Sequence, residues 1–308
     1  MNIKCNLIID SCCDLPASMV VGEGIKLLQF PYVLSDGTHY DDLFSTMTPK
    51  EFYDLMRKGE QPSTAQVALP HLRAAFEWAV QEGLPTVYLS FTAGLSGSFD
   101  AACIMREQIL ADHPDFELYV VDTLQASVTE GLFVLEAMRQ REKGMTAKEL
   151  VEWAEEARYY VDELFMIEDL DVLKRGGRIS PTVALAGGKL DVKPMLNIDI
   201  DGTLSVTGIA RGRKKGMKQL LSYYEKNHSV DGDSRIVFVG SADCDHDADR
   251  LVDMIQKSDP DAIVMRANIG PVIGSHVGPG MIAVVFWGND KRGNLSISDR
   301  IARAVKGA

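Results

Sequence analysis

Short apolar runs alternate with helical patterns through the first half of the sequence. The predicted strands are residues 7–9, 25–34, 86–91 and 118–122. The predicted helices are residues 71–82, 97–111 and 126–141. Because strands and helices alternate, the pattern predicts a mainly parallel sheet with helices on its faces. Ligands of such sheets bind beyond the carboxyl ends of the strands, in the connecting loops.

One further helix has clear start signals in the sequence. Thr48 can serve as the N-cap, Pro49 suits the first helical position, and Glu51 completes a capping box. Gly83 similarly suits the end of the helix predicted at residues 71–82. These residues predict where helices begin and end in the N-terminal half.

The second half of the sequence has a different pattern. A β-hairpin is expected over residues 197–209, around Asp201-Gly202, and a basic helix over residues 213–227. The remaining predicted elements are strands 236–240, 262–267 and 281–287 and helix 247–258. We therefore expect an α/β protein of two domains. Its parts are an N-terminal, mainly parallel α/β domain at 1–160, a C-terminal α+β domain at 161–288 and a tail at 289–308.

Composition narrows the classes of function. The chain has 308 residues and a net charge of −12, which argues against general nucleic-acid binding and against docking on an anionic membrane by charge alone. Asp10 interrupts the N-terminal apolar run too early for a signal peptide, and no run reaches the ~18 apolar residues of a membrane span. The five cysteines lack C-x-x-C spacing, which argues against a disulfide framework or a zinc site. These features predict a cytoplasmic protein without stable membrane insertion.

Polar loops follow several predicted strands. Ser11 comes after the first strand, residues 63–66 read Ser-Thr-Ala-Gln, and residues 93–98 read Ala-Gly-Leu-Ser-Gly-Ser. Glycines and free amides at a helix start attract an anion, and Ser96 and Ser98 add hydroxyl donors. Ordinary helix capping explains the same serines equally simply. The loops are therefore candidate anion sites.

Two basic segments and one histidine are the other candidates. Residues 173–180 place three cations around two glycines, and residues 210–215 are similarly basic. Each segment suits a carboxylate, a phosphate or an acidic partner, or else is a solvated turn or helix face. His276 lies in a Gly/Pro-rich run, residues 269–280, whose constrained backbone favours a defined place for the imidazole.

Searches for standard catalytic motifs are negative. Residues 94–98 fail the G-x-S-x-G pattern because Ser98 stands at the last glycine position. Residues 187–190 lack the upstream glycine and the hydroxyl of a P-loop. The chain has polar anchors but no recognisable catalytic centre, and we expect no enzyme activity and no cofactor.

Taken together, these segments resemble the DegV family from about residue 7 to residue 287. The motifs that carry the resemblance are residues 10–16, 63–66, 94–97, 121–131, 169–180, 210–215 and 270–280. The departures are Cys12-Cys13 after Asp10-Ser11, Ala65 in place of a serine, and Thr92-Ala93 in place of two serines.

The resemblance implies a protein that encloses one long-chain fatty acid in an apolar tunnel. By motif, Thr64, Ser96 and His276 would bind its carboxylate. Ser11, Gly94, Gly97, Ser98 and Gly274 would support the pocket. The family's characterised members are the lipid-binding component of a bacterial fatty acid kinase, whose separate ATP-binding subunit makes an acyl phosphate. The residues expected at the partner or at phosphate are Arg175, Arg178, Arg211 and Arg213.

Binding energetics are compatible with this expectation. At ~0.8 kcal/mol per buried methylene, a chain of roughly 14 to 16 carbons offers ~11–13 kcal/mol before ordering costs. Few polar contacts are then needed at the carboxylate.

Two other hypotheses use the same residues. A stand-alone serine hydrolase would use Ser96 with His276, although no orienting acid is evident in the sequence. A phosphate or phospho-ligand binder would use the arginine-rich segments instead. Cys12 and Cys13 are either reactive, if they lie at a helix start, or buried as small apolar residues.

Overall fold

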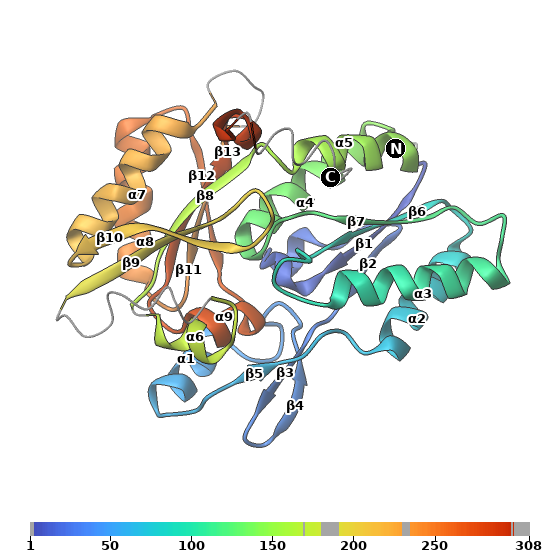
Figure 1. Ribbon diagram of the computed structural model, residues 1–308, viewed down its shortest axis with the longest axis horizontal. Helices are drawn as coiled ribbons and strands as arrows, with labels where there is room; N and C mark the ends of the chain where they lie inside the picture. Colours follow the sequence, from blue (N-terminus) through green and yellow to red (C-terminus); the bar gives the residue numbers. More distant parts are fainter. Residues whose placement is uncertain (1–2, 169, 180–190, 230–234, 297, 299–308) are drawn as a thin grey trace.

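Two large β-sheets face each other across a central helix in the computed structural model of the protein (Figure 1). The structure describes residues 3–168, 170–179, 191–229, 235–296 and 298. The central helix, α4, spans Ser127–Glu142 and contacts strands of the second sheet as well as the end of the first. A smaller sheet and three short helices lie below the gap between the two large sheets.

The first sheet is parallel, with strand order β2-β1-β6-β7. Its strands are β1 (Asn6–Asp10), β2 (Ile25–Leu28), β6 (Thr86–Ser90) and β7 (Leu118–Asp122). Helices α2 (Leu69–Glu82) and α3 (Ser98–Asp112) cover one face, and α4 and α5 (Ala147–Ala157) cover the other. Because both faces are covered, β1 and β6 are buried along their whole length.

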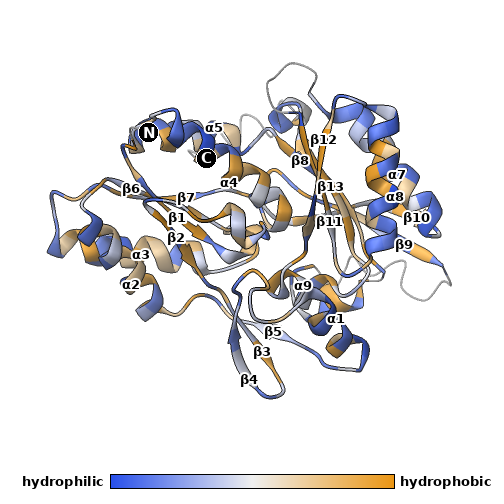
Figure 2. Ribbon diagram, turned by 180° about the vertical axis from the view of Figure 1, so that it is seen from behind, coloured by the Kyte–Doolittle hydropathy of each residue, from blue (hydrophilic) through white to orange (hydrophobic). Residues whose placement is uncertain are grey.

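The second sheet is mixed, with strand order β10-β9-β8-β13-β11-β12. Its strands are β8 (Val161–Met166), β9 (Val192–Ile198), β10 (Leu204–Arg211), β11 (Ile236–Ser241), β12 (Ile263–Asn268) and β13 (Ile282–Trp287). Helices α7 (Arg213–Asn227) and α8 (Asp245–Ser258) pack on its outer face, while α4 packs on its inner face. Figure 2 shows the apolar strands enclosed by helices whose outer surfaces are polar.

The small sheet has the order β4-β3-β5 and is antiparallel. It consists of β3 (Pro31–Leu34), β4 (Gly37–Tyr40) and β5 (Ser63–Thr64). The short helices beside it are α1 (Pro49–Arg57), α6 (Asp171–Arg175) and α9 (Pro271–Val277). The single-turn 3-10 segments are η1 (Ser11–Cys13), η2 (Ala17–Met19) and η4 (Lys291–Asn294).

Many expected elements are confirmed. Thr48 and Glu51 form the predicted capping box at the start of α1, and β9 and β10 form the predicted hairpin around Asp201-Gly202. Helix α7 has the predicted bounds. The expected α/β fold class, with a mainly parallel first sheet, is likewise confirmed, and the second sheet is mixed.

Other expectations differ from the structure. The extended run predicted at 25–34 is wrong: it divides into β2 and β3, which belong to different sheets. Helix α9 occupies part of the Gly/Pro-rich run, and α5 and β8 were not predicted. The helix start proposed at Ser180-Pro181 lies outside the described residues. Residue 160 falls between α5 and β8, where the chain passes from the first sheet to the second.

Candidate functional site

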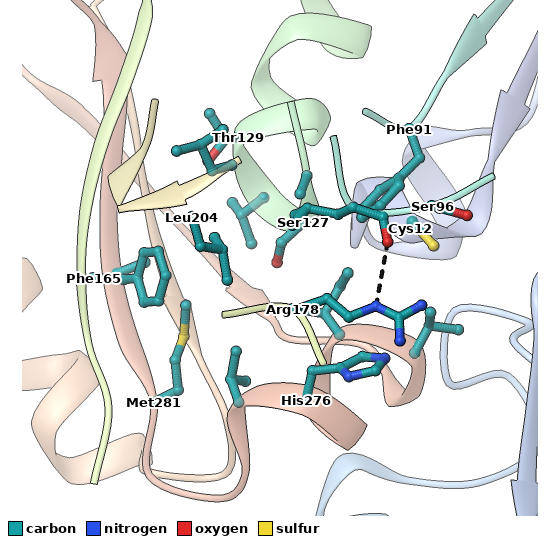
Figure 3. A pocket seen from close by; sticks show the side chains of 18 of the residues that line it. Cys12, Phe91, Ser96, Ser127, Thr129, Phe165, Arg178, Leu204, His276 and Met281 are labelled. Atoms are coloured by element: carbon teal, nitrogen blue, oxygen red, sulfur yellow. Dashed lines mark hydrogen bonds between the residues drawn. The ribbon is translucent and has the colours of Figure 1, made fainter. Parts of the chain in front are cut away.

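An apolar cavity lies between the two large sheets. It contains about 830 Å³ of space free of protein atoms, a figure that includes open solvent at its mouth. Strands β8 and β13 of the second sheet form one wall, and the start of α4 and the ends of the first sheet's strands form the other. Phe165, Leu204 and Met281 project into the space from the second sheet and its loops (Figure 3). A largely apolar chamber of this kind suits an extended hydrocarbon ligand.

Polar groups gather at one end of this cavity, near α9. We call this set the polar end; its members are Thr64, Ser96, Arg178 and His276. Thr64 is the last residue of β5, and its Oγ1 is hydrogen-bonded to His276 Nε2 at 2.7 Å. The contact joins the small sheet to helix α9 across 212 residues of sequence. Two of the three expected carboxylate-binding residues therefore touch each other directly.

Ser96 lies in the loop that leads from β6 into α3. Its hydroxyl donates to Ser98 Oγ at 3.0 Å and accepts from the Ser98 amide at 3.2 Å. Ser98 is buried and accepts from the amide of Val67 at 3.2 Å, so it ties this loop to the loop that follows Thr64. Ser96 lines the cavity, whereas Ser98 holds the two loops together behind it.

Arg178 reaches into the cavity beside His276 (Figure 3). Within the described part of the chain its guanidinium donates to two backbone carbonyls, from Nε to Leu95 at 3.3 Å and from Nη1 to Gly176 at 2.6 Å. Burial lowers the pKa of His276 to about 4, and the positive charge of Arg178 contributes in the same direction. The imidazole is therefore neutral near pH 7, and Arg178 supplies the positive charge at this end.

Glycines allow the close approach of these groups. A Cβ on Gly176 would lie 2.2 Å from His276 Nδ1, and a Cβ on Gly97 would lie 2.7 Å from Gln66 Oε1. A Cβ on Gly274 would meet the Tyr53 hydroxyl at 2.5 Å, so this glycine lets α9 pack against α1. A Cβ on Gly94 would lie 2.6 Å from the Gly202 carbonyl, where the hairpin tip meets the loop. These positions hold the polar end together and do not themselves line the cavity.

The hairpin tip is fastened to the same loop by Thr92. Its Oγ1 donates to the Gly202 carbonyl at 3.0 Å and accepts from the Gly94 amide at 3.1 Å. The threonine that replaces a serine of the family pattern therefore connects the first sheet to the second sheet's hairpin.

Ser11 lies away from the cavity lining. Its hydroxyl accepts from the amide of Phe30 at 3.1 Å and it is fully buried. It adjoins a group of buried carboxyl side chains that we call the acidic cluster: Asp10, Asp14, Asp41 and Glu130. Within the cluster, Ser127 donates to Asp14 Oδ2 at 2.5 Å, and Ser127 also lines the cavity. The acidic cluster thus supports the cavity wall from behind.

Burial raises the pKa of every member of the acidic cluster, to about 7 for Asp10 and for Asp41. Burial also raises the thiol pKa of Cys12 and of Cys13, both fully enclosed in η1. Of the two hypotheses for these cysteines, the structure fits the one in which they are buried as small apolar side chains.

The other arginines have different surroundings. Arg175 ends α6 and Arg211 ends β10, and both are exposed. Arg213 is half-buried and bonds to Glu168, to Asp247 and to the Gly280 carbonyl. Arg213 therefore links loops of the second sheet, whereas Arg175 and Arg211 are accessible to a partner.

The hydrolase hypothesis has little geometric support. Ser96 and His276 line the same cavity, but the serine hydroxyl bonds to Ser98 and the imidazole bonds to Thr64. His276 Nδ1 is buried and has no hydrogen-bond partner among the residues that the structure describes. The orienting acid of a catalytic triad is therefore missing from this part of the chain.

Some cavity residues have no signal in the sequence. Glu163 and Thr129 line the cavity on β8 and α4, where each has one apolar and one acidic neighbour in the sequence and belongs to no motif. Strand alternation places Glu163 on the same face as Phe165, but only once β8 is assigned. Pairing of β8 with β13 and β9 then brings both side chains to the cavity.

The described residues offer neither a membrane span nor a metal site. None of their helices is long and apolar enough to cross a membrane. None of their groups of His, Cys, Asp and Glu side chains, the acidic cluster included, is placed to hold a metal ion.

Fold and cavity together define an α/β protein of two facing sheets that encloses an apolar chamber with one polar end. A family model described as "Uncharacterised protein, DegV family" matches residues 4–289. The chain therefore belongs to the DegV family.

Relatives match over nearly their whole length. A DegV domain-containing protein of Clostridium perfringens is 38% identical over 282 residues, which cover 92% of this chain and 97% of that protein. A DegV family protein from Thermus thermophilus, described as binding fatty acid, is 26% identical with a TM-score of 0.78, over 93% of this chain and 100% of that one. A Thermotoga maritima protein, described as having a fatty acid binding function, is 25% identical with a TM-score of 0.77, over 92% and 99%.

Proposed function

We propose that this protein binds one long-chain fatty acid and presents its carboxylate to a separate ATP-binding kinase subunit. The observation that carries the proposal is the cavity itself, a chamber lined mainly by apolar side chains, with the polar end beside α9. The fatty acid binding described for the Thermus thermophilus relative supports the same ligand class.

The polar end suits a carboxylate. Arg178 offers charged N–H donors, and charge-assisted hydrogen bonds to carboxylates are stronger than neutral ones. The Thr64 and Ser96 hydroxyls can turn toward an acceptor, and the neutral imidazole of His276 carries one N–H donor. No second cation is needed for a single negative charge.

The part of the cavity remote from α9 suits the alkyl tail. Phe165, Leu204 and Val285 line this part, together with the small side chain of Ala283 on β13. Buried methylenes contribute ~0.8 kcal/mol each, so the tail supplies most of the binding free energy. The carboxylate contacts then fix the orientation of the chain.

Presentation to a kinase is the second half of the proposal. In that reaction a carboxylate oxygen attacks the γ-phosphorus of ATP, which forms the acyl phosphate and releases ADP. The partner supplies the nucleotide, and this chain supplies the positioned carboxylate. Arg175 and Arg211 are exposed cations on α6 and β10, so they are the candidates for contacting the partner.

The binding half is tested by mass spectrometry of an organic extract of the purified protein. A stoichiometric long-chain fatty acid, together with micromolar or tighter rebinding to delipidated protein, is the expected result. Ser96→Ala should weaken binding without changing any acyl-ester turnover. Delipidated protein that binds no long-chain fatty acid at micromolar concentration would end the proposal.

The kinase half is tested separately with loaded protein, ATP and an ATP-binding fatty acid kinase subunit. We expect acyl phosphate only when both proteins are present. Replacing Arg175 and Arg211 by Ala together should reduce product formation while fatty acid binding stays intact. Fatty acid binding with no acyl phosphate from any such subunit would leave a lipid carrier and remove the kinase assignment.

A further inference from the structure

The end of the cavity remote from α9 contains a buried carboxyl group. Glu163 lines the cavity from β8 and is 1% exposed. In the antiparallel register, Glu163 pairs with Val285 and Phe165 pairs with Ala283. Moving along β13 from Met281 to Val285 leads about 13 Å away from α9, at about 3.3 Å per residue. Glu163 therefore lies where the terminus of an alkyl chain would point, opposite the polar end.

A lysine from beyond the last strand is paired with this carboxyl group. Lys291 Nζ lies 3.5 Å from Glu163 Oε2 and 3.3 Å from the Ile198 carbonyl. The Ile198 amide donates to the other carboxyl oxygen of Glu163. The side chains of Lys291 and Glu163 are only 13% and 1% exposed, so the pair is enclosed. Both oxygens of Glu163 have partners inside the protein.

The segment that carries Lys291 is firmly attached. The Lys291 amide donates to the Tyr159 carbonyl at 2.9 Å. The next residue, Arg292, bonds to Glu156 and Asp290 and lies 4.6 Å from the centre of the Tyr159 ring. Lys291 also follows residue 289, where the match to the family model ends. The lysine of this pair thus comes from a segment outside the part that the family model describes.

We propose that the Glu163–Lys291 pair is the end wall of the acyl chamber and limits the length of the chain that it accepts. This inference rests on the proposed fatty acid binding. It assigns a selectivity role to a residue pair that lies outside the polar end. The ligand class is acyl chains that stop short of this wall.

The physical reason is the cost of moving or opening a buried ion pair. A longer chain would press its methyl group against hydrogen-bonded polar groups, or would displace Lys291 and leave the buried carboxylate of Glu163 without its cation. Burial raises the pKa of Glu163 to about 7, with Lys291 opposing the shift. Without Lys291 the carboxyl group would take up a proton and become an ordinary, less polar wall.

The test compares affinities for a series of saturated fatty acids of increasing length, measured by competition on delipidated full-length protein. Lys291→Met should raise the affinity ratio of longer to shorter acids by roughly tenfold, the gain from burying about two further methylenes. Glu163→Leu should raise the same ratio. Lys257→Met, an exposed lysine on α8, is the matched control and should leave the ratio unchanged.

Thermal unfolding of each variant shows whether it is folded. If Glu163→Leu does not fold, the affinity ratio of Lys291→Met alone tests the length limit. An unchanged ratio in Lys291→Met, with fatty acid still bound, overturns the length limit and leaves the pair a purely structural role. If wild-type protein binds no fatty acid, the proposed function fails instead.

Discussion

The polar end and the acidic cluster are two groups of polar side chains near the cavity wall, but only the polar end lines the cavity. Its side chains bond to one another and to nearby loops, and they also border the cavity. The acidic cluster turns inward: Asp10 accepts from the Phe91 amide at 2.7 Å, and Asp41 accepts from the Leu43 amide at 3.0 Å. One region thus borders the space where we propose that a ligand binds, and the other holds the backbone of neighbouring loops. Affinity should depend on the first region and stability on the second.

The largest expected effect is on stability, from the acidic cluster. Asp10→Ala leaves the buried Phe91 amide without its acceptor, and we expect the free energy of unfolding to fall by about 3 kcal/mol. Urea unfolding of ligand-free protein measures this change. Fatty acid affinity of the folded variant should change less than about threefold, within the scatter between independent sites. A large loss of fatty acid affinity with unchanged stability would show that the acidic cluster serves the ligand and not the fold.

The next effect is on affinity, from the polar end. Arg178→Met removes the cation of the cavity and should weaken fatty acid binding by about thirtyfold, the value of a hydrogen bond to a charged group. Titration calorimetry on delipidated protein gives the Kd. Arg175→Met, an exposed arginine in the same segment, is the control and should bind normally. Equal affinities for the two variants would show that Arg178 does not meet the carboxylate.

The pH dependence of stability distinguishes the two regions, because their groups change the free energy of unfolding in opposite directions as the pH falls. The pKa of folded His276 is about 4, below its ordinary value, so the unfolded chain takes up this proton first as the pH falls. The free energy of unfolding should drop by about 2 kcal/mol between pH 8 and pH 5 from this group alone. The raised pKa values of Asp10 and Asp41 act oppositely, because the folded protein binds those protons first.

The contribution of His276 is isolated by comparing wild type with His276→Asn at each pH. The difference in stability between them should shift against the wild type as the pH falls from 7 to 5. A difference that stays constant with pH would mean that the imidazole is not held neutral.

The smallest effect comes from a glycine. A Cβ on Gly176 would crowd His276 Nδ1, so Gly176→Ala should displace the imidazole from Thr64 and weaken fatty acid binding by roughly fivefold. Gly208→Ala is the control, since a Cβ there meets nothing within 4 Å. Equal Kd values for both variants would show that the position of the ring does not matter to the ligand.

Local chemistry allowed much of the fold to be predicted. Capping residues gave the start of α1, and turn residues gave the β9–β10 hairpin, because these signals act within a few residues. The split between β2 and β3 depends on which sheet each strand joins, which is decided by residues far along the chain. Helix α9 is short and contains Gly274, which local propensity disfavours in a helix but packing against Tyr53 requires.

The site residues likewise divide into those that local motifs predicted and those that depend on the tertiary fold. The motifs drew attention to Thr64, Ser96 and His276, and the structure brings all three to one cavity. The sequence around the arginines did not distinguish Arg178, which enters the cavity, from Arg213, which forms ion pairs. Nor could it show Glu163 at the far end, since that depends on the register of β8 against β13.

The Thr92–Gly202 contact has a mechanical consequence. It ties the first sheet to the hairpin of the second at one rim of the cavity, and the Thr64–His276 and Arg178–Leu95 hydrogen bonds join the same two halves near α9. A ligand that fills the cavity would add a contact common to both halves. We therefore expect a bound fatty acid to raise the temperature of unfolding of the two halves together.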